Sequence, residues 1–132
     1  MFFLDTNTCI YALEGPFREI RSRVAQLLPE RIKVPSMVLA ELLFGAAKSR
    51  DPDRTRRTIE DFVEPYEIIA FGGAAAAVHA EIRAELEGKG TPIGPNDLII
   101  AATALAANAT LVTHNTQEFA RVSGLKLQDW AQ

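Results

Sequence analysis

Three carboxylates in this sequence stand beside apolar segments, where an acid has no obvious structural role. Asp5 directly follows the apolar run FFL, Glu41 lies in the middle of SMVLAELLFGAAK, and Asp97 is the third residue of PNDLIIAATALAA. An ionised carboxylate that is buried without a partner costs several kcal/mol, so side chains of this kind require a compensating group. Acids at these three positions therefore indicate a site rather than a solvated surface.

Glu41 is the acid that is hardest to explain by structure alone. We predict that residues 36–48 form a buried helix, in which the neighbours of Glu41 at three and four positions are Met37, Val38, Phe44 and Gly45. None of these side chains pairs with a charge. A buried Lys or Arg, a raised pKa or a metal ion could each compensate Glu41, and the apolar segments that must form the core contain no basic residue. One cation held by Asp5, Glu41 and Asp97 would account for all three acids.

The donor types favour a hard cation. Carboxylate oxygens suit Mg²⁺ or Mn²⁺, whereas zinc is disfavoured because the chain has one cysteine, Cys9, and two histidines, His79 and His114. A lone cysteine also excludes an intramolecular disulfide, and we expect Cys9 to fill space in the core. A divalent cation held by a few carboxylates is suited to phosphate chemistry, because it activates water and neutralises a leaving oxygen.

Further polar residues follow the apolar run TLV at residues 110–112. Asn115 and Glu118 could support the metal site, although for Glu118 a solvent-exposed side chain is the favoured interpretation. His114 could face the same cleft, and we interpret His79 as a packing residue. Structural roles remain open for Asp5, as a helix N-cap, and for Asp97, in the first turn of a helix.

The elements that must position these residues alternate between strands and helices. We predict strands at MFFLD, IKVP, YEIIAF, TLVTH and LKLQDW, separated by helical patterns, with Ser36 as the N-cap of the helix that carries Glu41. Such alternation predicts an α/β fold with a central, mainly parallel five-stranded sheet flanked by helices. In such a sheet the ligand site lies beyond the carboxyl ends of the strands. With 132 residues, the chain is expected to be a single domain over 1–132.

Charge is unevenly distributed along the chain. Residues 1–57 hold 10 Lys/Arg and 7 Asp/Glu, a balance of +3, whereas residues 58–132 hold 4 and 10, a balance of −6. Arg54, Arg56 and Arg57 lie in the most basic stretch, which is either a solvated surface or a patch that contacts phosphates. The start of the chain lacks the pattern of a signal peptide, and no apolar run approaches the roughly 18 residues of a membrane span, so we expect a cytoplasmic location and no membrane contact.

Four stretches, FFLDTNTCIYAL, VPSMVLAELLFGAAKS, GTPIGPNDLIIAATALA and LVTHNTQEFARVSGLKLQDW, resemble the PIN-domain ribonucleases and, among them, the VapC toxins of bacterial toxin–antitoxin pairs. The resemblance spans nearly the whole chain and implies the PIN-like three-layer sandwich. It implies that Asp5, Glu41 and Asp97 bind Mg²⁺ or Mn²⁺ and are the catalytic acids. It also implies that Thr6 and Asn7 shape the first turn. The family often has an Asp where this chain has Asn115, which places the second metal in question. We expect Thr6, Asn7, Thr113 and His114 to position the substrate.

The function that the resemblance implies is metal-dependent endonucleolytic cleavage of RNA, which inhibits translation and growth. The chain is similar to the subgroup that cuts initiator tRNA in the anticodon region. A homodimer and a cognate VapB-type antitoxin, whose C-terminal tail enters the active-site groove, are the implied partners, assembled as a toxin–antitoxin hetero-oligomer.

Three alternatives differ in class. A haloacid-dehalogenase-type phosphatase has a second Asp two residues after the first, where this chain has Asn7. A phospho-accepting receiver domain has an Asp at the end of its third strand, where this chain has Ala70 and Phe71. A PIN-like domain that only binds RNA is disfavoured because uncompensated carboxylates repel phosphate.

Overall fold

The fold is built on one sheet of five parallel strands in a computed structural model that describes all residues, 1–132. The strands are β1 (Phe2–Leu4), β2 (Ile32–Pro35), β3 (Glu67–Ile69), β4 (Thr110–Val112) and β5 (Lys126–Gln128). Their order across the sheet is β3-β2-β1-β4-β5, and every neighbouring pair is parallel. The predicted fold class is therefore confirmed.

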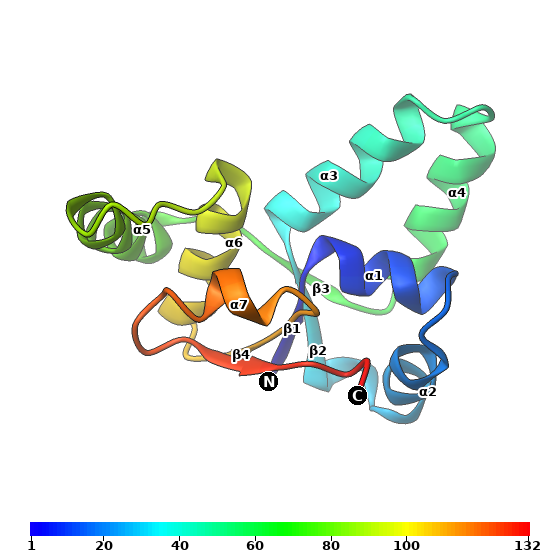
Figure 1. Cartoon of the computed structure of the whole chain (residues 1–132). Helices are drawn as coiled ribbons and strands as arrows, with labels where there is room; N and C mark the ends of the chain where they lie inside the picture. The colour runs from blue at the N-terminus through cyan, green and yellow to red at the C-terminus, as the bar shows by residue number, and fades with distance from the viewer.

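Seven α-helices flank the sheet. They are α1 (Thr6–Leu13), α2 (Arg18–Gln26), α3 (Ser36–Ala47), α4 (Pro52–Val63), α5 (Gly73–Gly88), α6 (Pro95–Ala106) and α7 (Thr116–Phe119), and a 3-10 turn, η1 (Pro29–Arg31), precedes β2. Figure 1 shows α5 and α6 on one side of the strands and α1 to α4 on the other. The layers match the predicted sandwich. None of these helices combines the length and the apolar character needed to cross a membrane.

The core is centred on the middle strands. Phe3, Leu4, Val34 and Leu111 are at most 1% exposed, because helices cover both faces of a parallel sheet. Helix α6 adds a run of buried small and branched residues that includes Ile100, Ala101 and Ala102. Cys9 is fully buried among them, as expected for a residue that fills space.

Helix α3 differs from the prediction. Only Val38, Leu42 and Ala46 are buried, on one face, while Phe44 is 64% exposed. The prediction of a buried helix was wrong because apolar residues occur all around α3, and only one face packs against the rest of the chain. The predicted Ser36 N-cap was also wrong, since the helix begins at Ser36 after Pro35 and no side chain caps it.

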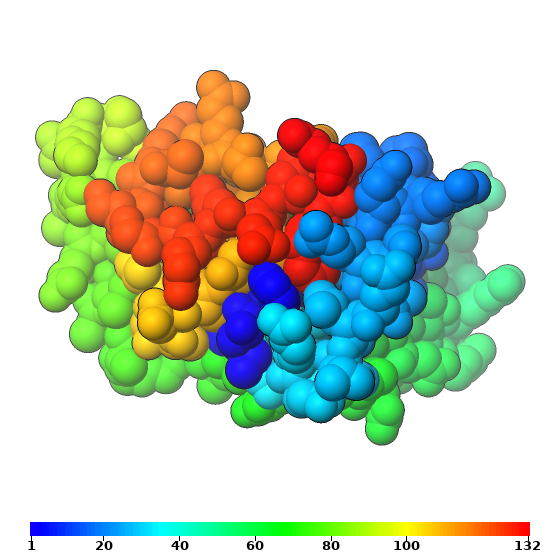
Figure 2. All heavy atoms as spheres, turned by 90° about the horizontal axis from the view of Figure 1, so that it is seen from below, coloured from blue at the N-terminus to red at the C-terminus, as the bar shows by residue number.

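The N-terminus lies at the amino ends of the strands, and Trp130, which follows the carboxyl end of β5, packs against β1. The carbonyl of Met1 accepts a hydrogen bond of 3.0 Å from the Thr110 backbone N–H, and the Phe2 and Trp130 rings pack edge to face with centroids 5.2 Å apart. In Figure 2 the first residues lie between the segment around η1, the start of β4 and the C-terminal segment. The polar residues of interest lie at the opposite, carboxyl edge of the sheet.

Candidate active site

The candidate site forms where the strand order reverses. The chain adds β2 and β3 on one side of β1 and then crosses back to place β4 on the other side. Parallel sheets bind ligands at such a switch point, beyond the carboxyl ends of the strands. Asp5 follows β1 directly and Thr113 follows β4 directly, so both residues lie at this position.

Asp5 is the most buried of the acids, with 6% exposure. It is the N-cap of α1, and its Oδ1 accepts a 2.9 Å hydrogen bond from the Thr8 backbone N–H. Burial raises the pKa of Asp5 above its ordinary value, although hydrogen bonds from Thr113 and Thr8 oppose the shift and the charge of Glu41 adds to it. Asp5 thus serves as a cap, one of its two predicted roles, and also lies within the electrostatic reach of a second acid.

Glu41 is half-buried and hydrogen-bonded rather than enclosed by apolar side chains. Its Oε1 accepts a hydrogen bond from the Thr6 hydroxyl, and its Oε2 accepts one of 3.3 Å from Nδ2 of Asn96. The large burial penalty inferred from the sequence therefore does not apply, although Glu41 does point to the same site as Asp5. Sequence reasoning missed Asn96, for which the only available signal was its position next to Asp97.

Asp97 and Glu118 form an interacting acidic pair at the start of α6 and in α7. Burial, followed by the charge and hydrogen bond of Glu118 and the charges of Glu41 and Asp5, raises the pKa of Asp97 to about 7. Partial burial by itself would raise the pKa of Glu118. The pKa of Glu118 is nevertheless lowered overall by hydrogen bonds from the Gly94 backbone N–H at 3.1 Å and from Asn115 Nδ2 at 2.8 Å. The hydrogen bond with Asp97 and the positive charge of Arg121 act in the same direction. The pair therefore keeps a proton up to a higher pH than an isolated carboxyl group would, and Asp97 is the member whose protonated form is favoured.

The structure thus brings Asp5, Glu41, Asp97 and Glu118 into one electrostatic cluster, with Asn115 and Thr6 attached to it by hydrogen bonds. Two other predicted positions contribute less directly. Asn7 is exposed on α1, and His114 is turned toward Asp129, with Nδ1 and Oδ2 3.0 Å apart. His79 packs its ring edge-on against Phe71, as expected for a packing residue.

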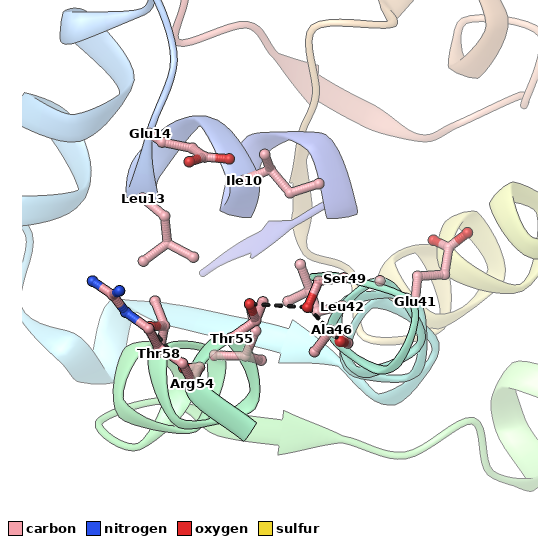
Figure 3. Close-up of a pocket in the computed structure, with 12 residues that line it drawn as sticks. Ile10, Leu13, Glu14, Glu41, Leu42, Ala46, Ser49, Arg54, Thr55 and Thr58 are labelled. Atoms are coloured by element: carbon pink, nitrogen blue, oxygen red, sulfur yellow. Dashed lines mark hydrogen bonds between the residues drawn. The ribbon is translucent and has the colours of Figure 1, made fainter. Parts of the chain in front are cut away.

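A cleft of about 510 Å³ adjoins the acidic cluster between α1, α3 and α4. Its walls include Ile10, Leu13 and Leu42, and Figure 3 shows Glu41 at one end of it and Arg54 toward the other. Of the three arginines predicted to contact phosphate, Arg54 lines the cleft, whereas Arg56 and Arg57 are exposed on α4 outside its lining.

The chemistry of these residues fits a divalent cation. Four carboxylates lie close enough to perturb one another, and Arg121 is the basic side chain whose charge acts on one of them. As the side chains stand, no three acidic, histidine or cysteine groups converge into a complete ligand set. Burial and the neighbouring carboxylates both disfavour the charged form of Asp97, a cation would offset both effects, and the oxygen donors suit Mg²⁺ or Mn²⁺.

Comparison with known proteins agrees with this arrangement. The PIN-domain family model matches residues 2–125. The chain is 40% identical to the tRNA(fMet)-specific endonuclease VapC of Salmonella typhimurium over 98% of this chain and 97% of the relative. The crystal structure of DNA-bound VapBC from Salmonella typhimurium superposes with a TM-score of 0.92 at 40% identity, covering 98% of this chain and 97% of that one. VapBC2 of Rickettsia felis, bound to a promoter DNA fragment, gives a TM-score of 0.91 at 39% identity, with 98% of both chains covered.

Fold and site together define a nuclease-like α/β protein with an acidic centre at the carboxyl edge of its sheet. The chain belongs to the PIN-domain family, in its VapC branch. Nucleases of this family generally depend on a divalent metal ion. The nuclease interpretation therefore prevails over the phosphatase and receiver-domain alternatives.

Proposed function

We propose that the chain acts as one PIN domain over residues 1–132 and is an endoribonuclease toxin that requires Mg²⁺ or Mn²⁺. Asp5, Glu41 and Asp97 are the metal-binding and catalytic acids in this proposal, with support from Asn115 and Glu118. The observation that carries it is the four-carboxylate cluster at the switch point of the sheet, where burial and then the neighbouring carboxylates raise the pKa of Asp97 to about 7.

The surrounding residues hold the acids in place. Asp5 is fixed as the cap of α1, Thr6 and Asn96 orient Glu41, and the Gly94 N–H orients Glu118. Because the pKa of Asp97 is about 7, its carboxyl group is protonated below that pH and must lose the proton before it can bind a cation, so metal affinity should fall as the pH is lowered. A bound divalent cation supplies a nucleophilic water near neutral pH and neutralises the charge that develops on the phosphate.

The substrate that we propose is the initiator tRNA, cut in the anticodon region. Support comes from the relative in Salmonella typhimurium, which is named a tRNA(fMet)-specific endonuclease and aligns over 98% of this chain. Such cleavage would inhibit translation and growth, and this substrate places the protein in the cytoplasm.

The partner that we propose is a VapB-type antitoxin, with the toxin as a homodimer in the hetero-oligomeric complex. The structures of relatives are those of VapBC complexes. The cleft between α1, α3 and α4 offers a docking surface that ends at Glu41, so a segment bound there would reach the acidic cluster (Figure 3).

The test is cleavage of purified initiator tRNA in Mg²⁺, with end-group analysis of the products. Attack by an external water needs no 2′-hydroxyl nucleophile, so the products should carry a 5′-phosphate and a 3′-hydroxyl. Excess EDTA and the Asp97→Asn variant should abolish cleavage, whereas His79→Ala should retain it. Products with a 2′,3′-cyclic phosphate, or complete arrest by one 2′-deoxy substitution at the cut site, would contradict the mechanism.

A non-catalytic RNA-binding role is disfavoured, because the relatives are named as an endonuclease and a ribonuclease. It predicts that the protein retains RNA in a gel-shift assay and produces no new RNA ends at any Mg²⁺ or Mn²⁺ concentration. Elongator tRNA is the matched control substrate for specificity.

A further inference from the structure

An ordered histidine lies beside the acidic cluster without belonging to it. His114 Nδ1 is 3.0 Å from Oδ2 of Asp129, whose side chain is only 12% exposed, while the His114 side chain is 43% exposed. Asp129 is itself fixed, because its Oδ1 accepts a 2.9 Å hydrogen bond from the Ala131 backbone N–H. The imidazole is therefore oriented by a carboxylate that cannot move freely.

Aromatic packing fixes the same ring from another side. The Phe17 ring lies 4.9 Å from the His114 ring, centroid to centroid, and Phe17 packs in turn against Tyr11 at 4.8 Å. Exposed ion pairs contribute little to stability, so stability alone does not account for an exposed histidine held by two contacts. Nε2 of His114 has no partner in the protein.

The chain places the backbone of His114 next to the acidic cluster. Its neighbour in the chain, Thr113, is fully buried and hydrogen-bonds to Asp5, and consecutive Cα atoms are about 3.8 Å apart. His114 thus lies at the carboxyl edge of β4, directly beside the acids to which the scissile phosphate must come.

We propose that Nε2 of His114 binds the ribose 2′-hydroxyl of a nucleotide next to the cleavage site, and that this contact favours RNA over DNA. This inference rests on the proposed function. Because Nδ1 faces a carboxylate, the proton of a neutral ring resides on Nδ1 and Nε2 is an acceptor. A phosphate oxygen offers no hydrogen to that acceptor, whereas a 2′-hydroxyl both donates and accepts and pairs with the ring in either protonation state. The 2′-hydroxyl is also the group by which proteins distinguish RNA from DNA.

The experiment measures binding separately from cleavage. The probes are the initiator tRNA anticodon stem–loop as RNA and a series in which one loop nucleotide at a time is 2′-deoxy. Affinities are measured by fluorescence anisotropy in the cleavage-deficient Asp97→Asn protein, with and without His114→Phe. Phenylalanine keeps the ring packed on Phe17 and removes both nitrogens. His79→Phe, in the same background, is the matched control because that histidine also packs against an aromatic ring, that of Phe71.

We expect one loop position at which the 2′-deoxy substitution weakens binding about 5-fold, the effect of losing one hydrogen bond. In His114→Phe the all-RNA probe should bind about 5-fold more weakly, and the deoxy substitution at that position should have no further effect. Asp129→Asn, which weakens the orientation of the ring, should reduce the same deoxy sensitivity, and His79→Phe should leave it unchanged.

The inference is overturned if the 2′-deoxy substitution weakens binding to His114→Phe as much as it weakens binding to the protein with His114. It is also overturned if His114→Phe weakens binding of the RNA probe and of every deoxy probe by the same factor. Cleavage of the tRNA by the wild-type protein is scored separately. If the wild type cleaves the tRNA and His114→Phe leaves the effects of the 2′-deoxy substitutions on binding unchanged, the His114 contact alone is rejected. A His114-dependent profile without cleavage by the wild type would reject the proposed function alone. A protein that neither binds nor cleaves the RNA would overturn both.

Discussion

Replacing Asp97 with asparagine should stabilise the metal-free protein at alkaline pH. In the folded chain Asp97 has a pKa of about 7, against an ordinary value of 3.8. The folded state therefore binds this proton more tightly than the unfolded state. Stability falls as the pH rises from about 4 to about 7, and the full penalty is present above pH 7. Asparagine keeps the shape of the side chain and removes the charge that causes the penalty.

The size of the effect follows from that shift. A difference of about three pKa units corresponds to at most about 4 kcal/mol at about 1.4 kcal/mol per unit. Asp97 is only half-buried, so solvent screening reduces this value, and we expect about 1–2 kcal/mol. For a chain of this size the melting temperature should rise by about 3–8 °C.

The assay is thermal unfolding followed by circular dichroism in EDTA, at pH 8 and pH 5. Asp97→Asn should melt above the wild type at pH 8, and the difference should shrink by more than half at pH 5, where the wild-type Asp97 is protonated when folded. Adding Mg²⁺ at pH 8 should raise the melting temperature of the wild type more than that of the variant. Glu81→Gln, an exposed carboxyl on α5, is the control and should show neither effect. Equal or lower stability of Asp97→Asn in EDTA at pH 8 would refute the reasoning.

Three further changes test other parts of the site. Glu41→Gln should melt within about 2 °C of the wild type, since Glu41 is half-buried. Its cleavage rate should fall about 100-fold or more. Unfolding of this variant would instead indicate a structural role for Glu41. Replacing Arg54, Arg56 and Arg57 with Gln should weaken RNA binding. The slope of the logarithm of the binding constant against the logarithm of the salt concentration should become shallower by about 0.7 for each phosphate that is no longer neutralised. An unchanged slope would show that the arginines face solvent. Gly45 lines the cleft between α1, α3 and α4, and a Cβ added there meets nothing within 4 Å. Gly45→Phe should therefore block antitoxin binding in a pull-down while the fold persists, and Gly45→Ala should keep binding and stabilise α3 by about 0.5–1 kcal/mol.

The sequence by itself determined the architecture because the relevant signals are local. A strand buried on both faces must be apolar along its length, and FFL, IKV and TLV are three such runs separated by helix-length segments. Asp5 follows one of these runs directly, so its place at the carboxyl edge of the sheet also follows from the chain order. The predicted parallel sheet and the deep burial of α6 are confirmed for this reason.

Tertiary structure decided which faces are covered and which polar groups meet. The composition of α3 does not reveal that Phe44 is 64% exposed, because an apolar residue shows no partner until the neighbouring helices are placed. Glu118 could have been a solvated acid, and its bond to Gly94 joins residues 24 positions apart. The contact between Glu41 and Asn96 spans 55 positions, and that between His114 and Asp129 spans 15. Contacts of this range leave no periodic signal in the sequence, since they depend on the crossover that brings α6, α7 and the last strand to the side of β1.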